Sequence, residues 1–258
     1  MAGFGREMTI PAIRAVLFDA GDTLIQMPRN PALTLQEVCR QWGLVVSLED
    51  AGRAYRRSER YYSLHYLTYK GDLGEFWRRF HGEALLSLGI DDPTGEQADY
   101  LSHVFGKEGV WAAFPEAASV CQQLQTMGMK LAVVSNGPNN TSDLLAQCGL
   151  LHYFDLVVAS QALGIQKPDP RIFSFALDRL GVSPQEALFV GDLYEVDVVG
   201  ARAAGIDAVM IDRHGKITQA DCPIISSLDR LIPMVKGRRP SAVGNQPGMV
   251  DRDGKENG

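Results

Sequence analysis

The sequence predicts an α/β protein: a Rossmann-like, doubly wound parallel sheet with an inserted α-helical domain. The first observation is that short apolar runs alternate with helical segments at both ends of the chain. Continuous apolar runs are typical of strands buried on both faces, as in parallel sheets. The second is one long interval that holds few such runs. We therefore expect a helix-covered sheet, interrupted once by helices.

Five apolar runs, each closed by small or polar residues, predict the strands of the sheet. They are "AVLF" at 15–18, "KLAVVSNG" at 130–137, "FDLVVAS" at 154–160, "ALFVGD" at 187–192 and "DAVMID" at 207–212. Helical patterning lies between them, at 115–128, 142–150, 171–181 and 195–205, and several of these segments end in glycine. Glycine is the residue most often found just past a helix end. Strands alternating with helices predict parallel βαβ units.

The interval 26–110 is rich in Arg, Tyr, Leu and Trp, and it predicts helices at 31–42, 48–68 and 73–88. We interpret it as a helical cap inserted after the first strand, between core segments 1–25 and 111–235. The last stretch, 236–258, is rich in Gly, Pro and charge and predicts a disordered tail.

Composition narrows the class of protein. The 258 residues are 45% hydrophobic and carry a formal charge of −6, which argues against nucleic acid or an anionic membrane as a partner. The four cysteines lie far apart and indicate neither a zinc site nor a disulfide framework. There is neither a signal-peptide-like start nor a membrane-spanning run. We expect a cytoplasmic protein that acts on a small molecule, and the sequence predicts no oligomeric state.

Residues with useful chemistry stand at the ends of the predicted strands. The first strand ends in Asp19, the second in Ser135 and the fourth in Asp192, with Asp197 five residues on; Lys167 lies in the loop "KPDP". Ligands bind at the carboxyl ends of parallel strands, so these side chains converge if the strands are neighbours. Clustered carboxylates need compensating charge, which Mg²⁺ and a lysine supply. The pattern predicts an anion site beside a carboxylate nucleophile.

Four motifs, in this order, resemble the haloacid dehalogenase (HAD) superfamily of hydrolases: "LFDAGDTL", "VVSNG", "KPDP" and "VGDLYEVDVVGARAAGI". The resemblance extends over nearly all of the first 235 residues, and it implies a hydrolase with a cap that selects substrate. It implies Asp19 as the nucleophile, Ser135 and Lys167 as the residues that bind the transferring group, and Asp192 as a magnesium ligand supported by Asp197.

By the same resemblance, the backbone carbonyl of residue 21 contributes to the magnesium site. The predicted substrate-binding set is completed by Thr23, Asn136 and Gly137, with Asn136 also serving as backbone scaffold. The phosphatases of the family carry a second aspartate two residues after the nucleophile, where this chain has Gly21. General acid–base help is worth about 10²- to 10⁴-fold, so its loss favours substrates with acidic leaving groups.

Asp22 lies one residue beyond that position. In an extended backbone its side chain points away from the face of Asp19, which predicts a turn residue outside the site. A turn re-aimed by Gly21 would bring Asp22 back toward it, so this alternative stays open.

Two other functions fit the motifs. The dehalogenase branch also lacks the second aspartate, but the retained Gly191 and Asp192 and the presence of Phe173 in place of its tyrosine favour magnesium-dependent phosphatase chemistry. A catalytically weak module that binds a phosphorylated ligand is the other alternative. Within the cap, four arginines share one helical face: Arg53, Arg56, Arg57 and Arg60. We expect a solvated face balanced by nearby acids rather than an anion-binding stripe. The five histidines have no paired spacing and no predicted catalytic role.

Overall fold

The computed structural model describes residues 12–27, 30–65, 73–108, 111–215, 217 and 219–237, so the predicted tail from 238 onward lies outside the described residues. A six-stranded parallel sheet has the order β5-β4-β1-β6-β7-β8. Its strands are β1 (Ala15–Phe18), β4 (Lys130–Ser135), β5 (Leu156–Ala159), β6 (Ala187–Gly191), β7 (Asp207–Ile211) and β8 (Ile224–Ile225). The five predicted strands are confirmed, and the short edge strand β8 is an addition.

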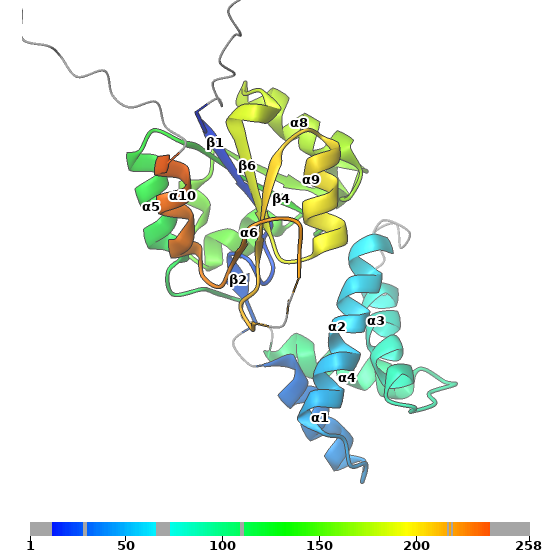
Figure 1. Ribbon diagram of the computed structural model, residues 1–258. Helices are drawn as coiled ribbons and strands as arrows, with labels where there is room; N and C mark the ends of the chain where they lie inside the picture. The colour runs from blue at the N-terminus through cyan, green and yellow to red at the C-terminus, as the bar shows by residue number, and fades with distance from the viewer. Residues whose placement is uncertain are drawn as a thin grey trace, which may run out of the picture.

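Side chains of β1 alternate between two hydrophobic cores, one on each face of the sheet. Val16 and Phe18 belong to the core formed with α5 (Ala117–Thr126), α6 (Thr141–Gln147) and α10 (Leu231–Gly237). Ala15 and Leu17 belong to the opposite core, formed with α7 (Ser160–Leu163), α8 (Pro170–Leu180) and α9 (Val199–Ala203). Figure 1 shows α5 and α10 on one side of the sheet and α8 and α9 on the other. Helices on both faces confirm the predicted α/β, Rossmann-like core.

Local signals set the ends of α8. The side chain of Asp169 accepts a hydrogen bond from the Arg171 N–H at 2.9 Å, and Pro170 occupies the first turn. Gly181, with φ 64°, ends the helix in the left-handed conformation. The prediction of a helix at 171–181 is thus confirmed to within a residue at each end.

One predicted helix differs from expectation. The segment 195–205 was expected to be a single α-helix, but the structure has a π-helical turn, η4 (Tyr194–Val198), followed by the short α9. The π-turn carries one more residue per turn, which rotates the following side chains relative to an α-helix. Short 3₁₀ turns complete the core: η2 (Leu151–Tyr153), η3 (Pro184–Glu186) and η5 (Leu228–Arg230).

Between β2 (Ile25–Gln26) and β3 (Ala112–Ala113), which pair antiparallel, the described chain is helical. It forms α1 (Pro31–Gln41), α2 (Leu48–His65), α3 (Leu73–Ser87) and α4 (Glu96–Glu108). These helices have a separate aromatic core, in which Tyr55 stacks on Phe105 at 5.6 Å and meets Phe80 edge-on at 5.2 Å. In Figure 1 they form a group beyond one end of the sheet, with one end of α2 nearest to the core. We call this group the cap.

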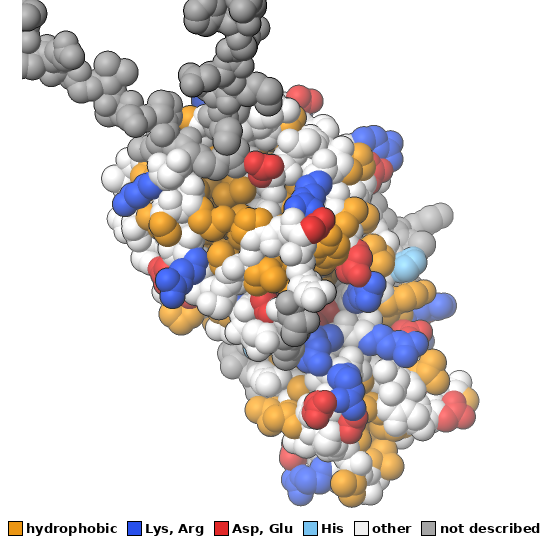
Figure 2. Space-filling view, in the orientation of Figure 1, with side chains coloured by type: hydrophobic (Ala, Val, Ile, Leu, Met, Phe, Trp, Pro, Cys, Tyr) orange, Lys and Arg blue, Asp and Glu red, His pale blue; other side chains and the backbone are white. Residues whose placement is uncertain are grey.

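Charged side chains of both signs are intermixed over the visible face of the cap (Figure 2). This pattern is typical of a solvated surface and not of a face that attracts polyanions. None of the helices in the described part of the chain combines the length and the apolar composition that crossing a membrane requires.

Candidate functional site

The strand order brings the predicted site residues to one edge of the sheet. β1 lies between β4 and β6, so Asp19 after β1, Ser135 at the end of β4 and Asp192 after β6 are neighbours. The Asp19 N–H donates to the carbonyl of Val190 at 2.8 Å, which continues the ladder past the last residue of β1. The expectation that these strands are adjacent is therefore confirmed.

Lys167 lies at the centre of this edge. Its Nζ donates to Asp19 Oδ1 at 2.6 Å and to Asp197 Oδ1 at 2.7 Å. The lysine side chain is 1% exposed, and those of Asp19 and Asp197 are 12% and 1% exposed. Burial lowers the pKa of Lys167, but the charges of Asp19 and Asp197 raise it by more. The pKa of Lys167 therefore lies above its ordinary value. The ammonium is therefore fixed in place and charged.

Asp192 completes a cluster with Asp19 and Asp197 in which one carboxylate oxygen of each lies within 4.8 Å of the others. Burial, and then the charges of Asp19 and Asp197, raise the pKa of Asp192 well above its usual range. Burial also raises the pKa of Asp19 to about 6, against the opposing effect of Lys167. Three carboxyl groups thus share the single ammonium of Lys167, and the raised pKa values of Asp19 and Asp192 indicate that the buried cluster has too little positive charge. Hard oxygen donors that lack compensating positive charge fit Mg²⁺.

The two oxygens of Asp197 both have partners within the protein. Oδ1 accepts from Lys167, and Oδ2 accepts from the Leu193 N–H at 3.0 Å across the π-turn. Gly191 allows this approach, because a Cβ on that residue would lie 2.4 Å from Cγ of Asp197. The π-turn and the glycine together place the Asp197 carboxylate beneath the lysine.

Gly200 has a corresponding role for the lysine loop. A Cβ at this position would lie 2.8 Å from the ring of Phe173 and 2.9 Å from Cα of Pro168. Only glycine lets α9 pack this closely against the residue that follows Lys167. The motif "VGARAAG" therefore supports the lysine loop by packing.

The loop after β4 holds Ser135, Asn136 and Gly137. Ser135 is 8% exposed, and a Cβ on Gly137 would lie 3.1 Å from its Oγ, so the chain turns tightly over the serine. The Asn136 side chain is bonded to the backbone of Lys167: its Oδ1 accepts from the Lys167 N–H at 2.7 Å, and its Nδ2 donates to the Lys167 carbonyl at 2.8 Å. These bonds agree with its predicted scaffold role.

The chain after Asp19 is a turn, so the extended backbone on which we based the orientation of Asp22 is wrong. The Ala20 carbonyl accepts from the N–H groups of Leu24 and Ile25, and Asp22 has φ 49°. Asp22 is exposed, yet its charge contributes to the raised pKa values of Asp192 and Tyr55. Thr23 is fully buried, and its Oγ1 has no hydrogen-bond partner among the described residues.

Arg213 is a site residue that the motifs did not reveal. Its guanidinium donates to the carbonyls of Asp22, at 3.1 Å, and Thr23, at 2.5 Å, and forms a 2.7 Å ion pair with Glu116. It also lies over the ring of Phe114 at 3.3 Å. Arg213 thus fixes the turn that follows Asp19. Its position two residues after β7 is the one signal in the sequence, and that position alone does not distinguish a residue that holds a turn from an ordinary surface arginine.

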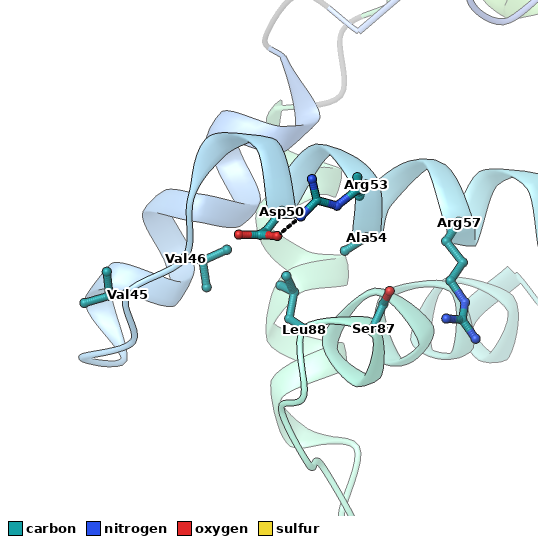
Figure 3. Close-up of a pocket in the computed structure, with 8 residues that line it drawn as sticks. All are labelled: Val45, Val46, Asp50, Arg53, Ala54, Arg57, Ser87 and Leu88. Carbon is teal, nitrogen blue, oxygen red and sulfur yellow. Dashed lines mark hydrogen bonds and ion pairs between the residues drawn. The ribbon is translucent and has the colours of Figure 1, made fainter. Parts of the chain in front are cut away.

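The cap arginines do not form a single anion-binding row. Arg53 pairs with Glu49 and Asp50, whereas Arg60 pairs with Glu195 of the core at 2.5 Å. Arg53 and Arg57 line a pocket of about 410 Å³ between α2 and α3 (Figure 3). That pocket includes none of the predicted catalytic residues. The expectation of a face balanced by nearby cap acids is confirmed for Arg53, whereas Arg60 differs from it by pairing with the core.

Comparisons with known proteins agree with the geometry. Residues 13–205 match the family model described as haloacid dehalogenase-like hydrolase. The chain is 32% identical over 234 residues to "Haloacid dehalogenase-like hydrolase domain-containing protein 3" of Danio rerio, covering 87% of this chain and 96% of that protein. It is 34% identical over 206 residues to "Glyceraldehyde 3-phosphate phosphatase" of Methanopyrus kandleri, covering 79% and 85%.

Among solved structures, the chain resembles a dehalogenase crystallised as an intermediate complex, with a TM-score of 0.68 and 26% identity over 87% of this chain and 98% of that one. The chain is thus similar, over most of its length, to one protein named as a phosphatase and to another named as a dehalogenase. The chain belongs to the haloacid dehalogenase-like hydrolases and is a hydrolase.

Proposed function

We propose that the protein is a magnesium-dependent phosphatase that acts on a small phosphate ester through an aspartyl-phosphate on Asp19. The observation that carries the proposal is that three carboxyl groups, those of Asp19, Asp192 and Asp197, cluster around the one ammonium of Lys167. A halide-releasing site has no need of three clustered carboxyl groups, whereas a site that binds a divalent cation together with a phosphate does.

The metal would be held by Asp192, by Asp19 and by the backbone carbonyl of Gly21, with Asp197 in support. When bound, Mg²⁺ would neutralise charge on the phosphoryl oxygens. Thr23, Ser135, Asn136 and Gly137 complete the proposed substrate site, with Asn136 and Gly137 acting through the loop they form. The cap, 26–110, would close over the core formed by 1–25 and 111–235.

The chain's own residues determine the order of the steps. Lys167 binds Oδ1 of Asp19, and the other carboxylate oxygen, Oδ2, would attack phosphorus. A bond forms between Asp19 and phosphorus while the ester P–O bond breaks, and the departing oxygen takes its proton from solvent because residue 21 has no side-chain acid. Water then attacks the acyl phosphate, which releases inorganic phosphate and restores Asp19.

The test is a panel of alkyl and aryl phosphate esters, assayed with Mg²⁺ and with EDTA, with Asp19→Asn as the control. We expect aryl esters to be hydrolysed faster, and we expect EDTA and the Asp19→Asn substitution each to abolish turnover. Equal rates for alkyl and aryl esters would contradict the leaving-group preference. Hydrolysis that survives the loss of Asp19 would contradict the nucleophile.

A dehalogenase is the second candidate, favoured by Gly21 and by the 26% identical dehalogenase structure. It predicts halide release from a 2-haloacid that persists in EDTA. A phospho-ligand-binding module without turnover is the third, and it predicts magnesium-dependent binding of a phosphate ester that is unchanged by Asp19→Asn. Halide and phosphate measured side by side on one preparation separate all three.

A further inference from the structure

The end of α2 contacts three loops of the core, and each contact adjoins a proposed catalytic residue. Asn136 Nδ2 donates to the Ser63 carbonyl at 2.6 Å, and Gln166 Nε2 donates to the Leu64 carbonyl. Arg60 pairs with Glu195. The three core residues lie next to Ser135, next to Lys167 and two residues before Asp197. We infer that docking of α2 positions the Lys167 loop, with Asn136 as the positioning residue that couples the two.

The Asn136 side chain has all of its amide protons in use. A primary amide has two N–H donors and one acceptor oxygen. Its Oδ1 accepts from the Lys167 N–H, while Nδ2 divides its two donors between the carbonyls of Lys167 and Ser63. Exchanging the amide oxygen and nitrogen would place an oxygen against two carbonyls, so the partners themselves fix the orientation. One amide thus joins the β4 loop, the lysine loop and the cap.

This geometry makes cap docking and lysine placement interdependent. When α2 is docked, the Ser63 carbonyl restricts the amide to the one orientation that also holds both backbone groups of Lys167. When α2 is undocked, one Nδ2 donor must be satisfied by water, and the amide is held only by its two bonds to the Lys167 backbone. Coupling of this kind is reciprocal, so a well-placed Lys167 loop also favours docking.

Gln166 adds a second contact from the lysine loop. Its side chain bonds to the cap, and its backbone directly precedes Lys167. The Arg60–Glu195 pair is exposed, at 61% and 46% of the two side chains, and exposed ion pairs contribute little. Of these three described contacts, the two amide-to-carbonyl bonds therefore contribute more to docking than the ion pair does.

The inference rests on the proposed function only for the role of Lys167 in turnover, so the test includes a measurement that is independent of turnover. The variants are Gln166→Leu, Asn136→Ala and the double substitution in the full chain. Gln161→Leu is the matched control, because the Gln161 side chain accepts from the Asn139 N–H within the core and has no hydrogen bond to the described part of the cap. The readouts are kcat and KM for p-nitrophenyl phosphate with Mg²⁺ and the hydrogen-exchange protection of the Lys167 amide.

We expect Gln166→Leu to lower kcat as well as to raise KM, and to reduce protection of the Lys167 amide by about five- to tenfold, the size of one neutral hydrogen bond. In the Asn136→Ala background, adding Gln166→Leu should reduce protection of the Lys167 amide by less than about a further twofold, since coupled residues give non-additive effects. Gln161→Leu should change neither readout. Should Asn136→Ala fail to fold, Gln166→Leu alone decides the matter through the exchange measurement.

Unchanged protection of the Lys167 amide in Gln166→Leu would overturn the inference, as would effects of the two substitutions that simply multiply. If the wild type hydrolyses no phosphate ester but the variants show coupled loss of exchange protection, the proposed function is rejected and the positioning role stands. If the wild type hydrolyses the ester but the variants show no coupling, the positioning role is rejected and the proposed function stands.

Discussion

Replacing Gly21 with aspartate tests whether the absent acid sets the leaving-group preference. A Cβ at residue 21 would meet only the Trp111 ring, at 3.9 and 4.0 Å, which is ordinary van der Waals contact. The backbone of Gly21 lies outside the left-handed region, so an aspartate is not strained there. The substitution should therefore fold and present a carboxyl group two residues from Asp19.

The expected gain comes from general acid catalysis, which is worth about 10²- to 10⁴-fold, or about 2.7 to 5.4 kcal/mol of barrier. We expect the lower end, because the added carboxyl group would join three carboxyl groups that share a single ammonium, a site not adjusted to a fourth. For an alkyl ester such as glycerol 3-phosphate, kcat/KM should rise by about 100-fold, while an aryl ester with a good leaving group should gain less than about tenfold.

The assay compares kcat/KM for the two esters in wild type, Gly21→Asp and Gly21→Asn. Asparagine matches the size of aspartate but has no acidic proton. A gain of equal size with asparagine would refute the acid–base reasoning, and so would an unchanged alkyl rate in a Gly21→Asp protein that retains its aryl activity. Asp22→Asn in both backgrounds checks whether Asp22 already supplies part of this help; if it does, wild-type alkyl activity falls.

Three further predictions follow from buried contacts. Gly191→Ala should displace Asp197 from Lys167. We expect the free energy of unfolding, measured in urea, to fall by about 3 kcal/mol, as for a broken buried ion pair, and kcat to fall with it. Unchanged stability and kcat would contradict the close approach of Asp197 to Gly191. Burial lowers the pKa of His81 to about 4, so the folded protein binds fewer protons than the unfolded chain between about pH 6.5 and 4, and stability falls as the pH falls. His81→Leu should remove about 2 kcal/mol of this loss at pH 5, measured as the difference in unfolding free energy from wild type. Mg²⁺ should raise the Tm because it binds only the folded state. Asp192→Asn should raise the Tm in the absence of metal, because it removes a buried carboxyl group next to Asp19 and Asp197, and it should abolish the increase caused by Mg²⁺. An increase that survives the substitution would place the metal elsewhere.

Much of the site could be predicted because buried parallel strands leave a strong local signal. The run before Asp19 and the run before Asp192 are apolar throughout, and parallel strands carry their last residues to one edge. The sequence does not show which strands are neighbours, but once β1 and β6 are adjacent, Asp19 and Asp192 must lie close together. The lysine loop followed from two prolines that limit its path.

The remainder depends on contacts between segments distant in sequence. The Asn136 amide bonds to residues 31 and 73 positions away, and no periodicity records such pairs. Arg213 holds carbonyls 190 and 191 positions away, so its role is invisible without the fold. The π-turn at Tyr194–Val198 was missed because a local helical pattern does not show that Asp197 must face inward.

The three aspartates of the cluster have the same side chain but different neighbours, and these neighbours indicate a different role for each. Asp197 has its oxygens bonded to Lys167 and to the Leu193 N–H, so its charge is committed to holding the lysine. Asp19 shares that lysine through Oδ1, so its other oxygen is the one that would act as the nucleophile. Asp192 lacks a bond to Lys167 among those described, and burial, followed by the charges of Asp19 and Asp197, raises its pKa well above its usual range. The carboxylate with the largest unmet need for positive charge is therefore the one best suited to a metal, which is why the choice between phosphatase and dehalogenase depends on Asp192 more than on the nucleophile that both share.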